Sequence, residues 1–229
     1  LRVLADRNDL PGRLDRAVIL ADMGRPAESN AEFDGALQMV HEFENRARVS
    51  AQETARGAGS LLVNDKMLEY QGSGYEKVLI HALKARNYLI LGDAEGARVE
   101  IRNANMRQDE ERTAHQKEVD ATAGKAKEKQ LDMRAIDAEI ERQFGAQASI
   151  IARVSSAYQN PFATYLSGVV YEANDEPGDA FVDYKNAYQI VPSPLLASEV
   201  GRLARRLNRR DEAAALGLTV PKGKPAAAG

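Results

Sequence analysis

Three histidines, His41, His81 and His115, are the side chains of this 229-residue chain best suited to bind a metal ion or to transfer a proton near neutral pH. They lie far apart in the sequence, and none is followed by a second histidine at the HExxH spacing that holds zinc on one helix face. His81 has apolar neighbours, so packing within a helix is favoured over metal binding. We therefore expect no metal site.

Short glycine-rich stretches are the next candidates, because such loops can hold a phosphate group. Gly57–Gly59 and Gly72–Gly74 do not continue into Gly-Lys-Ser/Thr, and Val119 stands where a phosphate loop ending at Gly124–Lys125 would need its first glycine. The acidic run Asp109–Glu111 is interleaved with basic residues, a pattern typical of a solvated helix face. The sequence therefore predicts no enzyme activity and no cofactor.

The charge of the chain argues against nucleic-acid binding. The net charge is −3 and the pI is about 5.8, whereas a general nucleic-acid binder needs a basic face. An arginine cluster near the C-terminus could meet an acidic protein, a phosphate or lipid headgroups, but complementing the dipole at a helix C-terminus is the favoured interpretation. The cluster comprises Arg202, Arg205, Arg206, Arg209 and Arg210.

The chain has no cysteine, which excludes disulfides, thiolate zinc sites and a cysteine nucleophile. No stretch reaches the roughly 20 apolar residues that a membrane-spanning helix needs. The sequence begins without Met and without a signal-peptide pattern, so we expect a mature or trimmed product. Residues 221–229 have low complexity and are expected to form a disordered tail.

The elements that would position any site are helices arranged in pairs. Residues 160–192 match the tetratricopeptide unit, in which small and aromatic residues recur where two helices cross. Looser matches cover about 11–40 and 76–106, and 194–217 resembles a polar capping hairpin. We expect an all-α fold, a tetratricopeptide-like α-solenoid that forms one domain over 1–220; unrelated helical hairpins are the alternative. The predicted repeat-packing residues are Ala85, Tyr88, Ala97, Ala104, Gly168, Tyr171, Ala180, Tyr184, Ala187 and Pro192.

About 50 extra residues, roughly 107–157, separate the last two units. They are nearly free of Gly and Pro and rich in helix-forming residues. The first half has no apolar stripe, and the second half gains one that includes Met133, Ile136 and Ile140. We expect a long helical hairpin, which is a spacer if it binds nothing and an arm if it binds a partner.

Local signals mark where two helices begin. Gly72 and Gly74 predict a sharp turn before a helix that carries Glu76 in its first turn, and Asn160–Pro161 is a cap followed by a first-turn proline. Glu100 is expected either to face inward and pair with Arg86 or Arg98, or to be exposed.

Two blocks, about a third of the chain, resemble an uncharacterised family of Gram-negative bacterial envelope proteins that look like tetratricopeptide-type lipoproteins. The residues that carry the resemblance are Tyr70, Tyr75–Glu76, Leu91–Asp93, Ala97–Glu100, Asn160–Phe162, Tyr165, Gly168 and Tyr171. The resemblance implies export to the periplasm and an outer-membrane tether; the cytoplasm is the alternative location. Any membrane contact is expected through an N-terminal lipid anchor that this chain does not contain.

The predicted function is that of a non-catalytic protein–protein interaction scaffold in the bacterial cell envelope. Its groove would be lined by first-helix residues, Lys84, Asn87, Thr164 and Ser167, and would hold a protein partner. The alternative is a structural subunit of a larger envelope or appendage-associated assembly, in which the 107–157 hairpin binds other copies of the chain. A third, weaker hypothesis is an accessory protein that activates a cell-wall synthase.

Overall fold

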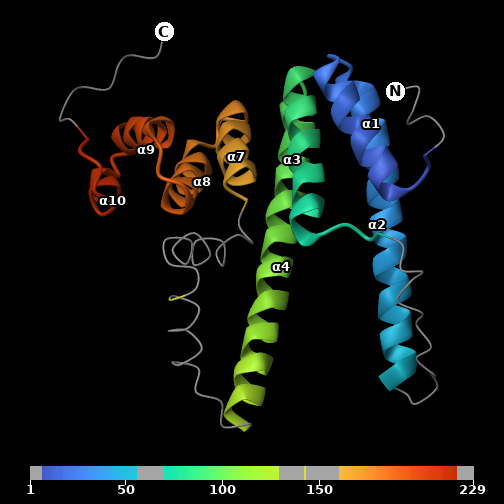
Figure 1. The fold of residues 1–229 in the computed structure, drawn as a ribbon. Helices are drawn as coiled ribbons and strands as arrows, with labels where there is room; N and C mark the ends of the chain where they lie inside the picture. Colours follow the sequence, from blue (N-terminus) through green and yellow to red (C-terminus); the bar gives the residue numbers. More distant parts are fainter. Residues whose placement is uncertain (1–6, 56–69, 129–141, 143–159, 221–229) are drawn as a thin grey trace. The chain divides into compact units, whose positions relative to one another are not determined.

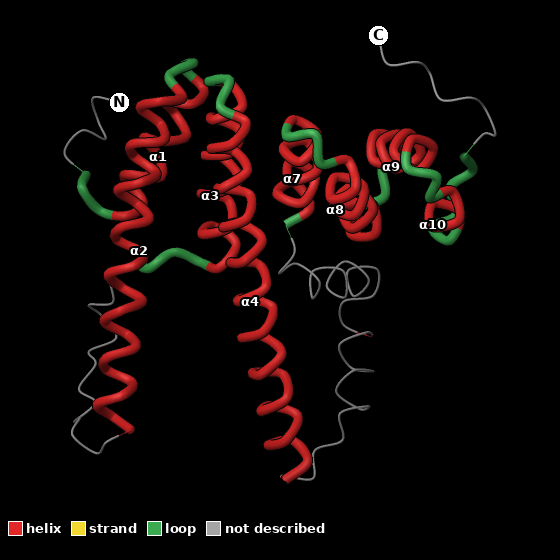
Figure 2. Tube along the Cα trace, turned by 180° about the vertical axis from the view of Figure 1, so that it is seen from behind, coloured by secondary structure: helices red, strands yellow, loops and turns green. Residues whose placement is uncertain are grey.

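The computed structural model describes residues 7–55, 70–128, 142 and 160–220, and the regular elements among them are all α-helices, as expected from the sequence (Figures 1 and 2). They are α1 (Leu10–Asp22), α2 (Pro26–Ala55), α3 (Gly74–Ile90), α4 (Ala94–Glu128), α7 (Pro161–Ala173), α8 (Pro177–Ile190), α9 (Pro194–Arg206) and α10 (Arg210–Ala214).

The chain divides into two compact units, Leu1–Glu100 and Ile101–Gly229, and the division falls within α4. The expectation of one domain over 1–220 stays a prediction.

The same turn closes four helical hairpins, α1–α2, α3–α4, α7–α8 and α9–α10. One residue after each first helix has a positive φ, between 56° and 77°, and the next residue donates its N–H to the carbonyl five positions back, which satisfies an end carbonyl of the helix. The left-handed residues are Gly24, Gly92, Asp175 and Asn208. The hydrogen bonds run from Arg25 to Leu20, from Asp93 to Tyr88, from Glu176 to Tyr171 and from Arg209 to Ala204, at 2.8–2.9 Å.

The helix starts are fixed by side-chain caps. The side-chain oxygen of Asn160 accepts hydrogen bonds from the backbone N–H groups of Phe162 and Ala163 at 3.0 and 3.2 Å, which confirms the start predicted at Asn160–Pro161. The carboxylate of Glu76 accepts a hydrogen bond from the backbone N–H of Ser73 at 2.7 Å, at the start of α3. That contact is the returning half of a capping box, so Glu76 does more than complement the helix dipole.

In the first unit, α2 packs on both α1 and α3. The core is a cluster of buried side chains that includes Leu10, Phe33, Val40, Phe43 and Ile80. Figure 1 shows α2 continuing well past the end of α1. The helix extends beyond residue 40, the predicted end of the first repeat-like unit, and Phe43 in this extension is still buried in the core.

In the second unit, α8 packs on both α7 and α9, and α10 packs on α9. The core here is formed by Phe181, Tyr184, Val200 and Leu203 with several alanines. Gly168 lies against the ring of Tyr184, so closely that a Cβ at this position would overlap the ring.

The predicted repeat-packing residues take mostly buried positions. Ala85, Ala97, Ala104, Gly168, Ala180, Tyr184 and Ala187 are buried. Tyr88 and Tyr171 are half-buried, and Pro192 is exposed just after the end of α8.

The region expected to form a helical hairpin, 107–157, is described in its first part, which is helical to Glu128 within α4. Its second arm falls almost entirely outside the described residues, as do the tail at 221–229 and the Gly57–Gly59 stretch. None of the helices in the described ranges is both long and apolar enough to cross a membrane.

Candidate functional site

The four residues predicted to line an exposed groove are buried. The exposed fractions are 5% for Lys84, 0% for Asn87, 8% for Thr164 and 0% for Ser167. The expectation of an open surface is therefore corrected for Lys84, Asn87 and Ser167, which hydrogen bonds hold between neighbouring helices. Thr164 is bonded to the start of its own helix and borders the recess described below.

In the first unit, Lys84 lies between two carboxylates. Its ammonium group is 2.6 Å from Asp34 of α2 and 2.6 Å from Glu100 of α4. The second carboxylate oxygen of Glu100 is 2.7 Å from Nδ1 of His81. His81 thus has a satisfied position on a packed helix, as its apolar neighbours suggested.

The charge balance of this cluster sets the pKa values of two of its members. Burial alone would raise the pKa of Glu100, but hydrogen bonds from His81 and Lys84 and their charges hold it below its usual value. Burial would likewise lower the pKa of Lys84, and the contacts with Asp34 and Glu100 raise it instead. Glu100 faces inward as one of the two alternatives proposed, but its partners are Lys84 and His81 rather than Arg86 or Arg98.

Asn87 makes a second buried link between α3 and α2. Its side-chain amide donates to Oγ of Ser29 and to Oδ1 of Asn30, both at 2.9 Å. Lys84 and Asn87 therefore join helices within the first unit, and neither presents its side chain to solvent.

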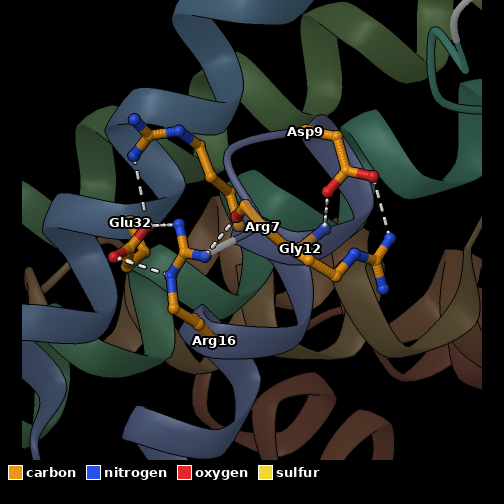
Figure 3. A network of polar contacts seen from close by, with 6 residues as sticks. Arg7, Asp9, Gly12, Arg16 and Glu32 are labelled. Atoms are coloured by element: carbon orange, nitrogen blue, oxygen red, sulfur yellow. Dashed lines mark hydrogen bonds and ion pairs between the residues drawn. The ribbon is translucent and has the colours of Figure 1, made fainter. Parts of the chain in front are cut away.

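A further polar network fastens α1 to α2 (Figure 3). The Arg16 guanidinium donates to both carboxylate oxygens of Glu32 at 3.0 Å and to the backbone carbonyl of Arg7 at 2.5 Å. Asp9 caps α1 by accepting from the backbone N–H of Gly12 at 3.1 Å. Hydrogen bonding by Arg16 lowers the pKa of Glu32. Because Arg16 is buried and paired twice, this network is structural.

In the second unit, polar side chains surround a recess that encloses about 220 Å³. Its lining residues come from α4, α7 and α8. We call it the α7 recess, and its described lining residues are Asn105, Gln108, Asp109, Thr164, Asp183 and Asn186. Two of the six carry a carboxylate and none carries a basic group.

Hydrogen bonds run through the α7 recess from α4 to α8. Gln108 donates to Oδ1 of Asn105, and Asn105 donates to Oγ of Ser167, each at 3.4 Å. The Ser167 hydroxyl donates in turn to the carboxylate of Asp183. Gln108 also accepts the backbone N–H of Asn160 at 2.7 Å, so the wall on α4 is attached to the start of α7.

Among the lining residues of the α7 recess, Asp183 has a strongly shifted pKa. Burial, with a smaller contribution from the nearby charge of Asp179, outweighs the hydrogen bond from Ser167 and raises the pKa of Asp183 to about 6. Sequence reasoning missed Asp183, Asn105, Gln108 and Asn186. The sequence held one signal for Asp183. This acid directly precedes Tyr184, which was predicted to be a repeat-packing residue and is buried.

The C-terminal arginines are largely engaged within the second unit. Arg202 pairs with Glu172 and, at 2.5 Å, with Glu199. The Arg209 guanidinium lies 5.5 Å from the ring centroid of Phe181. Arg205 and Arg206 occupy the last turn of α9, where positive charge complements the helix dipole.

Among the described residues, no group of three His, Cys, Asp or Glu side chains is placed to hold a metal ion. His41 is exposed and the side chain of His115 lies outside the described part of the chain. A scan against protein-family models, a search of curated proteins and a search of solved structures each find no match to this chain. The resemblance to envelope lipoproteins therefore stays a prediction.

Proposed function

We propose that this chain is a non-catalytic scaffold that binds a protein partner, built on a tetratricopeptide-like α-solenoid. Two features support the repeat architecture: the shared turn at four hairpins, and the small residues at helix crossings, such as Gly168 against Tyr184. Repeat proteins of this kind use surfaces that span several helices to hold their partners.

The observation that carries the binding role is the α7 recess. Three helices contribute hydrogen-bonding side chains to it, and Asp183 has a single hydrogen-bond donor, Ser167, among the described residues. Core polar groups normally satisfy one another, as they do around Lys84. The polar groups of the α7 recess also hydrogen-bond to one another, but they border a space of about 220 Å³ that a side chain of a partner can enter.

The proposal also includes a cellular location, which rests on the resemblance to Gram-negative envelope lipoproteins. We place the scaffold in the periplasm of a Gram-negative bacterium, attached to the outer membrane through a lipid anchor. Docking on a cell-wall synthase and activating it is one form that such a role would take.

The test is photo-cross-linking from the recess in intact cells. A photoreactive amino acid replaces Asn186, which is half-buried in the α7 recess, and the matched control replaces the exposed Ser198 on α9. We expect one recurrent foreign protein to be captured from position 186 and not from position 198. Equal capture from both positions, or none from position 186, would contradict the scaffold proposal.

The exposed face of α4 favours the structural-subunit alternative. Beyond the recess this helix presents alternating acids and bases to solvent, including Glu110, Arg112, Lys117 and Asp120. Faces with both signs of charge suit side-by-side contacts between helices of different copies. Replacing 113–156 by a short Gly/Ser linker keeps the described recess residues. Loss of self-association in sedimentation velocity would support the subunit; retained capture from position 186 would support the scaffold.

A further inference from the structure

A second open space lies at the C-terminal end of the second unit and shares no described lining residue with the α7 recess. It measures about 630 Å³ and lies between α10 and the residues that follow this helix. We call it the α10 pocket, and its described lining residues include Arg210, Asp211, Ala214, Leu218, Thr219 and Val220. Arg210 supplies the only basic group among the described lining residues.

Arg210 differs from neighbouring arginines in having no counterion. Arg202 pairs with two glutamates, and the Arg209 guanidinium lies 3.5 Å from Glu212. No described side chain pairs with Arg210, and its Nε is buried without a hydrogen-bond partner. The adjacent acid, Asp211, does not neutralise it, because consecutive residues of a helix do not face each other.

The unpaired guanidinium is an incentive for a ligand to bind. A buried donor of a charged group is costly to leave without an acceptor, and most such groups in native structures have one. Because Arg210 is only half-buried, a ligand can reach the other N–H groups of the guanidinium. An anion bound there would supply the counterion that the described residues do not.

The groups around Arg210 define the chemistry of the ligand. A guanidinium presents paired N–H donors that match the two oxygens of a carboxylate. Ala214, Leu218 and Val220 add apolar surface to the same lining, which an alkyl group of the ligand would cover. The exposed carboxylate of Asp211 also belongs to the lining, so it disfavours a second negative charge on the ligand.

We propose that the α10 pocket binds a monocarboxylate that carries a short apolar group. Arg210 holds the carboxylate, and the apolar lining covers the alkyl group. Two sources share this chemistry, a free organic acid and the C-terminal residue of a peptide with an apolar side chain, and a space of about 630 Å³ has room for either. The inference is independent of the scaffold proposal, which rests on the α7 recess.

The test is NMR spectroscopy of the full chain, with 4-methylpentanoate as the free acid and Nα-acetyl-leucine as the peptide mimic. We expect saturable shifts at Arg210, Ala214 and Leu218, with dissociation constants on the order of millimolar. The matched neutral amides of both probes should bind at least about tenfold more weakly, because they lack the charge. Acetate should also bind more weakly, because it lacks the alkyl chain. The tighter of the two acids assigns the source.

A pair of arginine variants tests the site from the side of the protein. Arg210→Gln should weaken binding of the acids at least about tenfold, because it removes the charge and the paired donors. The matched control is Arg205→Gln, which removes an exposed arginine of α9 outside the described lining. It should leave the affinity within about twofold, since solvent screens a distant exposed charge.

Three results would overturn the inference. The first is an unchanged affinity in Arg210→Gln with a native-like spectrum. The second is equal binding of the acids and their amides, or no saturable shift with either acid. The third is tighter binding of inorganic phosphate than of both acids, which would contradict the assignment to a carboxylate. None of these results bears on capture of a partner from position 186, so the scaffold proposal is tested separately.

Discussion

Glu100 binds both Lys84 and His81 inside the first unit, and its substitution tests how strongly such a buried cluster depends on one carboxylate. In Glu100→Gln the charge disappears while Lys84 stays buried with only Asp34 as its counterion. Breaking a buried pair by removing one partner is strongly destabilising. We expect the free energy of unfolding to fall by about 2–4 kcal/mol in urea denaturation followed by circular dichroism.

The control for Glu100→Gln is Glu95→Gln, in the first turn of the same helix. The Glu95 side chain is exposed and pairs with Arg98 at 2.9 Å. Exposed pairs contribute little, so the change should be no more than about 0.5 kcal/mol. Similar losses in the two variants would show that the cluster around Glu100 has no special role in stability.

A substitution at Gly168 tests how closely α7 and α8 pack against each other. In Gly168→Ala the added methyl group overlaps the ring of Tyr184, which must move and would lose its hydroxyl contact with Glu172, now 3.1 Å long. We expect a loss of about 1–3 kcal/mol, measured as a lower midpoint in thermal unfolding. Gly201→Ala, where nothing lies within 4 Å, should instead raise the midpoint. A destabilised Gly201→Ala or a neutral Gly168→Ala would contradict this packing.

These residues also show what sequence can and cannot provide. A glycine at a fixed offset before an aromatic residue on the next helix predicts close packing, because repeat geometry fixes which positions meet. The partners of Glu100 were missed because helix-surface spacing suggested two nearby arginines, while the actual partners, Lys84 and His81, lie on α3. Lys84 was predicted to be exposed for the same reason: its counterion Asp34 is 50 residues away in sequence.

At the scale of elements, the four turns share a geometry but not a residue type. Gly24 and Gly92 adopt positive φ without strain, whereas Asp175 and Asn208 do so with a Cβ. Asn208→Gly should therefore stabilise the α9–α10 hairpin by about 0.5 kcal/mol, and Gly92→Ala should destabilise the α3–α4 hairpin by about 1 kcal/mol. Native-state hydrogen exchange of α10 and α3 measures the two effects; opposite signs would contradict the turn assignment.

The helices themselves were more predictable than the site. Asn160–Pro161 predicted the start of α7, and Gly72 with Gly74 predicted the turn before α3. The capping box of Ser73 and Glu76 was not predicted, although its residue types are a local signal. The α7 recess was not predictable, because it depends on three helices whose contributing side chains are up to about 80 positions apart. Asn105 and Asp183 have no spacing that marks them as neighbours.

At the scale of the whole molecule, carboxylates with lowered pKa values and one carboxylate with a raised pKa change the free energy of unfolding in opposite directions as the pH falls. Glu32, Glu100 and Glu172 have lowered pKa values in the folded state, so their contribution is present above pH 4.5 and is lost as the pH falls through those lowered values. Asp183 has a raised pKa of about 6. The folded state therefore binds its proton first, and stability from this residue increases as the pH falls from 7 toward 4.

The free energy of unfolding should accordingly rise on going from pH 7 to about pH 5 and then decrease below about pH 4.5. Asp183 accounts for a rise on the order of 2 kcal/mol. Denaturant titrations at pH steps of half a unit measure the profile. Asp183→Asn should remove the rise between pH 7 and 5 and leave the acid decrease in place; a persistent rise would assign it to another group.

The turn shared by the four hairpins also has a consequence for the evolution of the chain. A coding segment that runs from one left-handed residue to the next, for example from Asp175 to Asn208, specifies α8 and α9 with equivalent ends. Recombination between two such points would duplicate or delete that segment and leave the same backbone geometry at the junction. The number of hairpins can therefore change in one genetic step, without a new loop having to be found by selection.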